Sequence, residues 1–231
     1  MCNLNLQETE DAIMRFNQNP INLATDYLTR PQFEQPIAAE RIPAMVVVID
    51  GLWGTQLFRD RGVREKIALN LKNNWQGICE TMKSLSENDL RETPQKVYEA
   101  AKNVFPFILG QGQEHKQHYS FTTKFFHWCT RNHFPIVDSR TRKSINRVQR
   151  DQGLIRGLVL TPQEMDRLSY IEEYERWVYF YSDLLNSLSN DHCNRILYAD
   201  RESQQNTNSA LAIENTVLRV LDKKFYQDGG N

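Results

Sequence analysis

Asp138 is the residue whose position most clearly suggests chemistry. It follows the apolar run from Phe134 to Val137, and five of the next twelve residues are basic. The basic residues are Arg140, Arg142, Lys143, Arg147 and Arg150. A basic segment attracts a polyanion, and a carboxylate beside it could stabilise a positively charged transition state. The pattern therefore indicates chemistry next to a phosphate backbone.

The segment after Asp138 has the pattern of a helix that begins there. A side-chain oxygen of Asp138 or Ser139 can accept hydrogen bonds from the free amides of the first turn, and Ile145 and Val148 then share one face. From the residues alone, Asp138 is either a helix cap, with a contribution of about 1 kcal/mol, or a catalytic carboxylate.

The charge of the chain is unevenly distributed. The whole chain has a net charge of −1, but residues 112–150 contain eight Lys or Arg and two acidic residues, so this segment is +6 and the remainder −7. Such asymmetry is typical of proteins that bind nucleic acid through one basic region. A basic face that is merely solvated is the alternative.

Length and composition indicate a folded protein of ordinary size. The 231 residues are 40% hydrophobic and 25% charged, and no apolar run reaches the roughly 20 residues of a membrane span. The N-terminus lacks a signal-peptide pattern, so a cytoplasmic location is expected.

Metal binding is not expected either. The four cysteines form no C-x-x-C pair, so we expect them to be reduced thiols. Two pairs of possible ligands are closely spaced in the sequence, His115 with His118 and Cys129 with His133. Neither pair has a convincing third and fourth ligand. No cofactor is expected.

The apolar spacing predicts helices nearly throughout, and strand alternation is almost absent. The spacing of Phe121, Phe125 and Trp128 indicates one buried helical face. Residues 165–188 are predicted to form a long helix rich in aromatic residues, whose rings are expected mainly in the core. Residues 201–208 are predicted to be a polar linker before a last helix from Leu211 to Phe225. The fold class is therefore predicted to be all-α.

Three motifs, in this order along the chain, resemble those of the helix–hairpin–helix DNA glycosylases. Residues 51–57 (Gly-Leu-Trp-Gly-Thr-Gln-Leu) resemble the early segment whose Gln enters the DNA. Leu109-Gly110-Gln111-Gly112 resembles the hairpin, and residues 135–147 resemble the segment with the invariant Asp. Residues 120–127 and 134–139 are similar to the bacterial 8-oxoguanine-glycosylase-like branch, some members of which act in phage defence.

The resemblance implies a two-lobed helical bundle with a DNA cleft between the lobes. Residues 45–115 would form a central lobe, and residues 1–44 with 116–231 a second lobe that carries Asp138. The whole chain would be one monomeric glycosylase unit bound to double-stranded DNA with a modified base.

The resemblance also assigns roles to individual residues. Asp138 would be the catalytic carboxylate, because cleavage of an N-glycosidic bond leaves positive charge on the sugar. Gly110 and Gly112 would let backbone amides approach a phosphate. The basic residues that would contact DNA are Arg140, Arg142, Lys143 and Arg147.

Displacement of a base from the duplex needs a wedge and a stacking pocket. Gln56 is the candidate wedge, with Trp53 and Phe58 as candidate pocket residues. Core packing is the alternative for Trp53.

The identity of a catalytic lysine is left open by the sequence. Family members that use a lysine place it at the start of the helix after the hairpin, and the corresponding residues here are Tyr119 and Ser120. Lys124, one turn into that helix, is the first candidate, and Lys116, on a lengthened loop, is the second. The sequence thus predicts a DNA glycosylase for an 8-oxoguanine-like lesion or a hypermodified phage cytosine; the alternative is a non-catalytic DNA-binding or protein-interaction module.

Overall fold

The described part of the protein is mainly helical. A computed structural model describes residues 4–29, 38–55, 57–59, 62–110, 118–130, 132–152 and 167–230, with the backbone alone for Phe58 and residues 148–152. No strand occurs in these ranges. The prediction of an all-α fold is confirmed.

Twelve α-helices lie in the described part of the chain. The first six are α1 (Leu6–Asn17), α2 (Pro20–Thr29), α3 (Ile42–Trp53), α4 (Val63–Lys83), α5 (Asp89–Glu92) and α6 (Pro94–Val104). The others are α7 (Pro106–Leu109), α8 (Tyr119–Cys129), α9 (Ser139–Gln152), α11 (Tyr170–Ser187), α12 (Asn190–Asn208) and α13 (Val217–Gly229).

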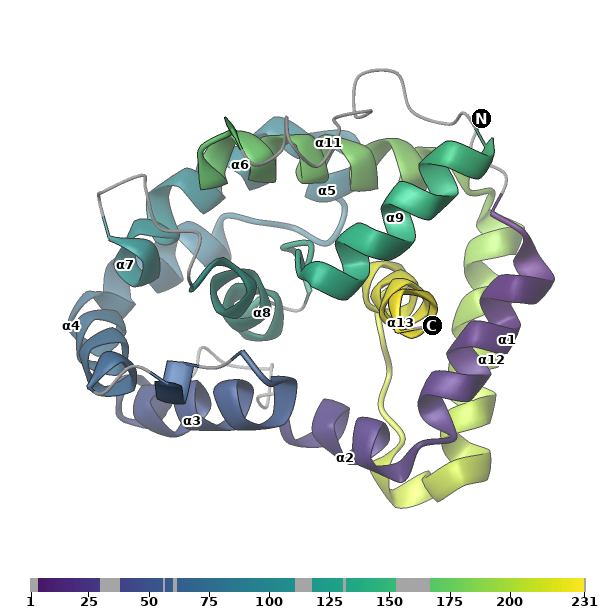
Figure 1. Cartoon of the computed structure of the whole chain (residues 1–231), viewed down its shortest axis with the longest axis horizontal. Coiled ribbons are helices and arrows are strands. Elements are labelled where there is room, and N and C mark those ends of the chain that lie inside the picture. The colour runs from purple at the N-terminus through teal and green to yellow at the C-terminus, as the bar shows by residue number, and fades with distance from the viewer. Residues whose placement is uncertain are drawn as a thin grey trace.

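Helices α8 and α13 occupy the middle of the fold, and most of the others surround them (Figure 1). Helix α8 packs against α3 and α7, whereas α13 packs against α9, α1 and α12. Helix α11 packs against α5 and α6. The C-terminal helix therefore lies in the interior, next to the helix that follows Asp138.

Both central helices are buried around their whole circumference. In α13 every residue from Leu218 to Phe225 is buried, including Arg219 and Asp222. In α8 the aromatic face predicted from the sequence is buried together with Lys124, and so are Thr123 and His127 on another face. Charged side chains are rarely buried without a partner, so these two helices must bring compensating charges together.

The close approach of α9 and α13 depends on a glycine. A Cβ atom on Gly229, near the end of α13, would collide with the backbone carbonyl of Arg140 in the first turn of α9. Glycine is the residue without this atom, so it allows the two backbones to touch. The start of α9, and with it Asp138, is thereby held against the central helix.

The predicted linker over residues 201–208 is wrong, because this segment is the second half of α12. Two of its polar residues are buried and hydrogen-bonded: Ser203 accepts a hydrogen bond from Asn17, and Gln204 bonds the backbone of Ile213 in both directions. The last helix begins at Val217 rather than Leu211. The composition reflects the exposed side of a helix, and the hydrogen bonds of its two buried residues hold that helix to the fold.

The division into two lobes stays a prediction. Buried apolar side chains form one cluster that extends from Ile13 to Phe225. None of the helices described above has the length and apolar character needed to cross a membrane.

Candidate active site

Lys124 and Asp138 form a buried ion pair. The ammonium Nζ of Lys124 lies 2.9 Å from Oδ2 of Asp138, and the two residues are only 5% and 8% exposed. The same ammonium also donates to the backbone carbonyl of Trp53, at 3.4 Å. The structure therefore brings the first lysine candidate of the sequence to the proposed catalytic carboxylate.

Asp138 is a helix cap as well as an ion-pair partner. Its Oδ1 accepts a hydrogen bond of 2.9 Å from the backbone amide of Thr141, while Oδ2 faces Lys124. Burial acts to raise the pKa of Asp138, but the Lys124 charge and the Thr141 amide outweigh it and hold that pKa below its ordinary value. The carboxylate is thus ionised and fixed in orientation at neutral pH.

Helix α8 positions the segment that leads to Asp138. Thr123 accepts a hydrogen bond from the amide of Val137 and donates one to its carbonyl, at 3.1 and 3.3 Å. His127, one turn further along α8, donates from Nδ1 to the carbonyl of Phe134. Burial lowers the pKa of His127 well below its ordinary value, so the ring is neutral and serves as this anchor.

Two tryptophans flank the ion pair. Trp53 stacks on Trp128 with ring centroids 5.7 Å apart, and the Lys124 ammonium lies 5.9 Å from the Trp53 ring. Trp53, a candidate pocket residue, therefore lies beside the pair and also packs in the interior. The side chain of Phe58, the second candidate, lies outside the described residues.

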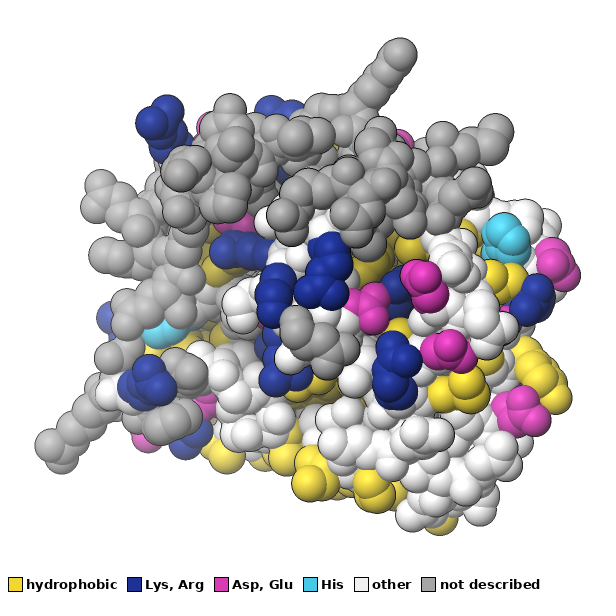
Figure 2. Space-filling model, turned by 45° about the vertical axis from the view of Figure 1, so that its right-hand side comes forward, with side chains coloured by type: hydrophobic (Ala, Val, Ile, Leu, Met, Phe, Trp, Pro, Cys, Tyr) yellow, Lys and Arg dark blue, Asp and Glu magenta, His cyan; other side chains and the backbone are white. Residues whose placement is uncertain are grey.

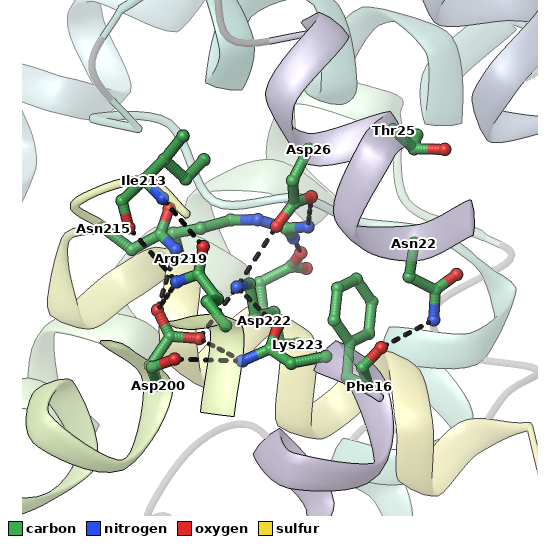
Figure 3. Close-up of polar contacts among 12 residues, drawn as sticks. Phe16, Asn22, Thr25, Asp26, Asp200, Ile213, Asn215, Arg219, Asp222 and Lys223 are labelled. Carbon is green, nitrogen blue, oxygen red and sulfur yellow. Dashed lines mark hydrogen bonds and ion pairs between the residues drawn. The ribbon is translucent and has the colours of Figure 1, made fainter. Parts of the chain in front are cut away.

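Helix α13 adds a set of charges to the site that sequence reasoning missed. Arg219 lies 4.7 Å from the Trp128 ring and forms ion pairs with Asp26 and Asp222 (Figure 3). Lys223, the next cation along this helix, pairs with Asp26 and Asp200. The spacing of Arg219, Asp222 and Lys223, at i, i+3 and i+4 on one face of the helix, was the signal that could have revealed them.

Asp138 and Asp222, which both interact electrostatically with Lys124, differ in their protonation. Burial raises the pKa of Asp222 to about 7, because Arg219 offsets only part of the desolvation and Asp138 adds repulsion. Tyr181, whose hydroxyl has no hydrogen-bond partner among the described residues, is buried close enough to both carboxylates to feel their charge. Asp138 is thus a permanent anion, whereas Asp222 can hold a proton near neutral pH.

The basic residues of α9 fall into two groups. Arg140, Lys143 and Arg147 are exposed, and Arg140 also stacks over Tyr226 at 4.3 Å. Arg142, by contrast, pairs with the buried Glu173. Figure 2 shows a group of Lys and Arg side chains near the middle of one face, with acidic side chains close by. Three of the four predicted phosphate contacts therefore have exposed side chains, and the fourth, Arg142, is half-buried and bound to Glu173.

The remaining predicted residues lie mostly outside the described part of the chain. Gln56, Gly112 and Lys116 are in this category. Gly110 ends α7 with a left-handed φ of 75°, and its amide donates to the carbonyl of Pro106. Gly110 therefore terminates a helix, and its approach to a phosphate stays a prediction.

Comparisons of the chain with models of known protein families, with curated proteins and with solved structures returned no match. The resemblance to the glycosylases stays a prediction that depends on the motifs. Within the described ranges, no group of three potential ligands could hold a metal ion.

The arrangement provides an amine, a fixed carboxylate and an aromatic wall in one buried place. A carboxylate can stabilise positive charge on a sugar, and an amine can act as a nucleophile once it loses its proton. A purely structural ion pair is the alternative role, since such pairs also occur in protein interiors.

Proposed function

We propose that the protein is a DNA glycosylase that cleaves the N-glycosidic bond of a modified base. The observation that carries the proposal is the 2.9 Å ion pair between Lys124 and Asp138, at the start of a helix with exposed basic side chains. An ion pair at such a helix start combines a reactive amine, an anion and an attraction for phosphate. The motif order of the sequence supports the same function.

Asp138 would act through its fixed negative charge. As the bond between the base and C1′ of the sugar breaks, the base takes the bonding electrons and positive charge develops on the sugar. An anion already oriented by the Thr141 amide stabilises that charge without reorganisation.

Lys124 would act in one of two ways. As a neutral amine it attacks C1′ and forms a covalent bond to the sugar, after its proton has moved to a nearby carboxylate or to the departing base. As an ammonium it keeps Asp138 oriented while water attacks. The first route leads to cleavage of the strand, and the second stops at an abasic site.

The DNA would be held by the exposed cations of α9, and the displaced base would lie near Trp53. Two classes of substrate fit the resemblance: an oxidised purine such as 8-oxoguanine, in repair, and a hypermodified cytosine such as glucosylated hydroxymethylcytosine, in phage defence. The protein would act as a cytoplasmic monomer.

A panel of duplexes tests the activity. The purified protein is incubated with duplexes that contain 8-oxoguanine, uracil, an alkylated base or glucosylated hydroxymethylcytosine, and strand scission after alkali is scored. We expect scission with one of them and a loss of at least about 10²-fold in Asp138→Asn, as for other electrostatic groups in active sites. Lys96→Gln, which removes a Lys–Asp pair of 2.7 Å elsewhere in the fold, is the matched control and should keep full activity.

Trapping with borohydride separates the two routes. An adduct that is lost in Lys124→Ala and kept in Lys116→Ala assigns the amine to Lys124. If duplexes are cleaved only after alkali and no adduct forms, water is the nucleophile.

The burial of the ion pair favours one competing function, a DNA-binding or protein-interaction module in which the pair is structural. Such a module would leave every duplex intact. Asp138→Asn would then lower its stability and leave its binding affinity unchanged at temperatures where it is folded.

A further inference from the structure

The interior around the ion pair contains one more carboxylate than cations. A group of charges on α2, α12 and α13, joined to one another by ion pairs (Figure 3), interacts electrostatically with this pair through Asp222. The buried members of this group are the carboxylates Asp26, Asp138, Asp200 and Asp222 and the cations Lys124, Arg219 and Lys223. An excess negative charge is costly in an interior of low dielectric constant, and one bound proton removes it.

The other buried charges of the described residues do not supply the missing cation. Each of them has an opposite charge of its own. The pairs are Glu173 with Arg142, Lys224 with Asp228, Asp50 with Arg64 and Asp89 with Lys96.

Asp222 is the least compensated of the four carboxylates. Asp26 faces two cations, Arg219 and Lys223. Asp200 faces Lys223 and also accepts hydrogen bonds from the side-chain amides of Asn17, Gln204 and Asn215. The ion pair of Asp222 is with Arg219, which Asp26 shares. The extra proton is therefore expected on Asp222, in agreement with its raised pKa of about 7.

Asp222 also acts on the candidate active site through its charge. It interacts electrostatically with Lys124, with Asp138 and with Tyr181. The charged and titratable groups on the elements around it include Arg15 (α1), Asp26 (α2), Lys124 and the neutral His127 (α8), Asp138 and Arg140 (α9 and its cap), Tyr181 (α11), Asp200 (α12) and, on α13 itself, Arg219, Lys223, Lys224 and Asp228.

We propose that Asp222 is a positioning residue that holds a proton beside the Lys124–Asp138 pair and thereby controls how firmly Lys124 is kept as an ammonium. With the proton bound, Lys124 faces one anion, Asp138. When Asp222 ionises, a second anion favours the ammonium form and opposes its conversion to a nucleophilic amine. The role in catalysis depends on the proposed glycosylase function, whereas the proton itself does not.

The proton is tested without any substrate. The side-chain carboxyl carbon of Asp222 is followed by ¹³C NMR from pH 4 to pH 9, with its resonance assigned by its loss in Asp222→Asn. We expect a midpoint near 7. Asp138→Asn should lower the midpoint because it removes a repelling charge, and Lys124→Met should raise it because it removes an attracting one. A carboxyl already ionised at pH 5, or a midpoint that neither variant moves, overturns the proposal.

The positioning role is tested with the cleaved duplex. The rate of borohydride trapping is measured against pH for the wild type and for Asp222→Asn, which keeps the shape of the side chain and cannot ionise. The ratio of variant to wild-type rate should be constant below pH 6 and rise several-fold through pH 7 to 8.

Asp89→Asn is the matched control, because it changes a buried carboxylate that pairs with Lys96 outside this group and whose pKa of about 2 lies far below the tested range; its ratio should not vary with pH. A flat ratio for Asp222→Asn overturns the positioning role although the enzyme is active. If the wild type cleaves no duplex even after alkali, both the proposed function and the positioning role are wrong. If it cleaves after alkali but forms no borohydride adduct, the proposed function stands and the positioning role is overturned. In both cases the NMR titration still decides whether Asp222 holds the proton.

Discussion

Lys124 and Asp138 depend on each other because each would be an uncompensated charge if its partner were removed. Both are buried, and Asp138 in addition caps α9. A residue of this kind affects stability and activity together, so a loss of activity alone does not reveal its role. The free energy of unfolding must therefore be measured together with the activity of each variant.

Removal of one partner should cost more stability than removal of both charges. Asp138→Asn should lower the free energy of unfolding by about 3 kcal/mol, because it leaves a buried ammonium unpaired. The double variant Asp138→Asn with Lys124→Met should recover much of this loss, since no buried charge remains. Urea unfolding of the two single variants and the double variant gives the coupling energy. Additive losses would show that the ion pair contributes nothing.

Asp222 should make stability fall as the pH rises from about 4 to 7. Its pKa is raised from 3.8 to about 7 in the folded protein. Between these values the folded state binds a proton that the unfolded state has lost. The free energy of unfolding should therefore fall by up to about 1.4 kcal/mol per pH unit relative to Asp222→Asn. Above pH 8 the difference between the two proteins should be constant. A difference that rises with pH, or one that is flat from pH 4, contradicts the raised pKa.

At the scale of the element, α8 is the helix that places both members of the pair. It contains Lys124 and, through Thr123 and His127, also fixes the extended segment before Asp138. Helix α13 then closes against α9 at Gly229. The geometry of the pair therefore depends on contacts that do not involve either of its charges.

Thr123→Val should weaken the site without changing its charge. The substitution preserves shape but leaves the amide and the carbonyl of Val137 without their hydrogen bonds, at a cost of about 1–3 kcal/mol. Activity should fall as well, because Asp138 follows Val137 directly. Thermal unfolding and cleavage rates are measured beside Thr81→Val, whose hydroxyl bonds a carbonyl of its own exposed helix. Equal effects in the two variants would refute the anchoring role.

Gly229→Ala should separate α9 from α13. The new Cβ would meet the backbone of Arg140, which cannot rotate away, so we expect a loss of about 1–3 kcal/mol. Gly51→Ala is the control, because nothing lies within 4 Å of a Cβ atom at that position. Replacement of an exposed helical glycine by alanine raises the free energy of unfolding by about 0.5–1 kcal/mol. The stability of both variants is measured by their denaturant midpoints. An unchanged midpoint in Gly229→Ala would show that the two helices do not need this contact.

The sequence could predict local features of the site better than its long-range ones. The helix start after Asp138 and the buried face of α8 follow from capping and from spacing, and both are confirmed. The partner of Asp138 could not be predicted, because the distance to Lys124 depends on how the chain turns between the two helices. The charges of α13 were missed for the same reason, since their compensation comes from α2 and α12.

At the scale of the whole molecule, the exposed cations of α9 are the expected contact surface for DNA. Arg140, Lys143 and Arg147 are exposed there, next to the buried pair. Phosphate contacts release counterions, so binding should weaken steeply with salt.

Arg140→Gln with Lys143→Gln should reduce the salt dependence of DNA binding. The slope of log K against log salt should become less steep by about 2, that is, about 0.9 for each lost phosphate contact. The control, Lys72→Gln with Lys83→Gln, removes the same charge from exposed positions on α4 and should leave the slope nearly unchanged. The slope is measured by fluorescence anisotropy at several salt concentrations. Equal slopes in the two double variants would place the DNA elsewhere.

The most direct test of the central claim is the release of free base from the duplex panel in a single turnover, by the wild type and by Asp138→Asn. Mass spectrometry identifies the base, and circular dichroism verifies that the variant is folded at the temperature used. We expect release of one modified base by the wild type and a loss of at least about 10²-fold in the folded variant. Release of no base, or equal release by both proteins, would contradict it.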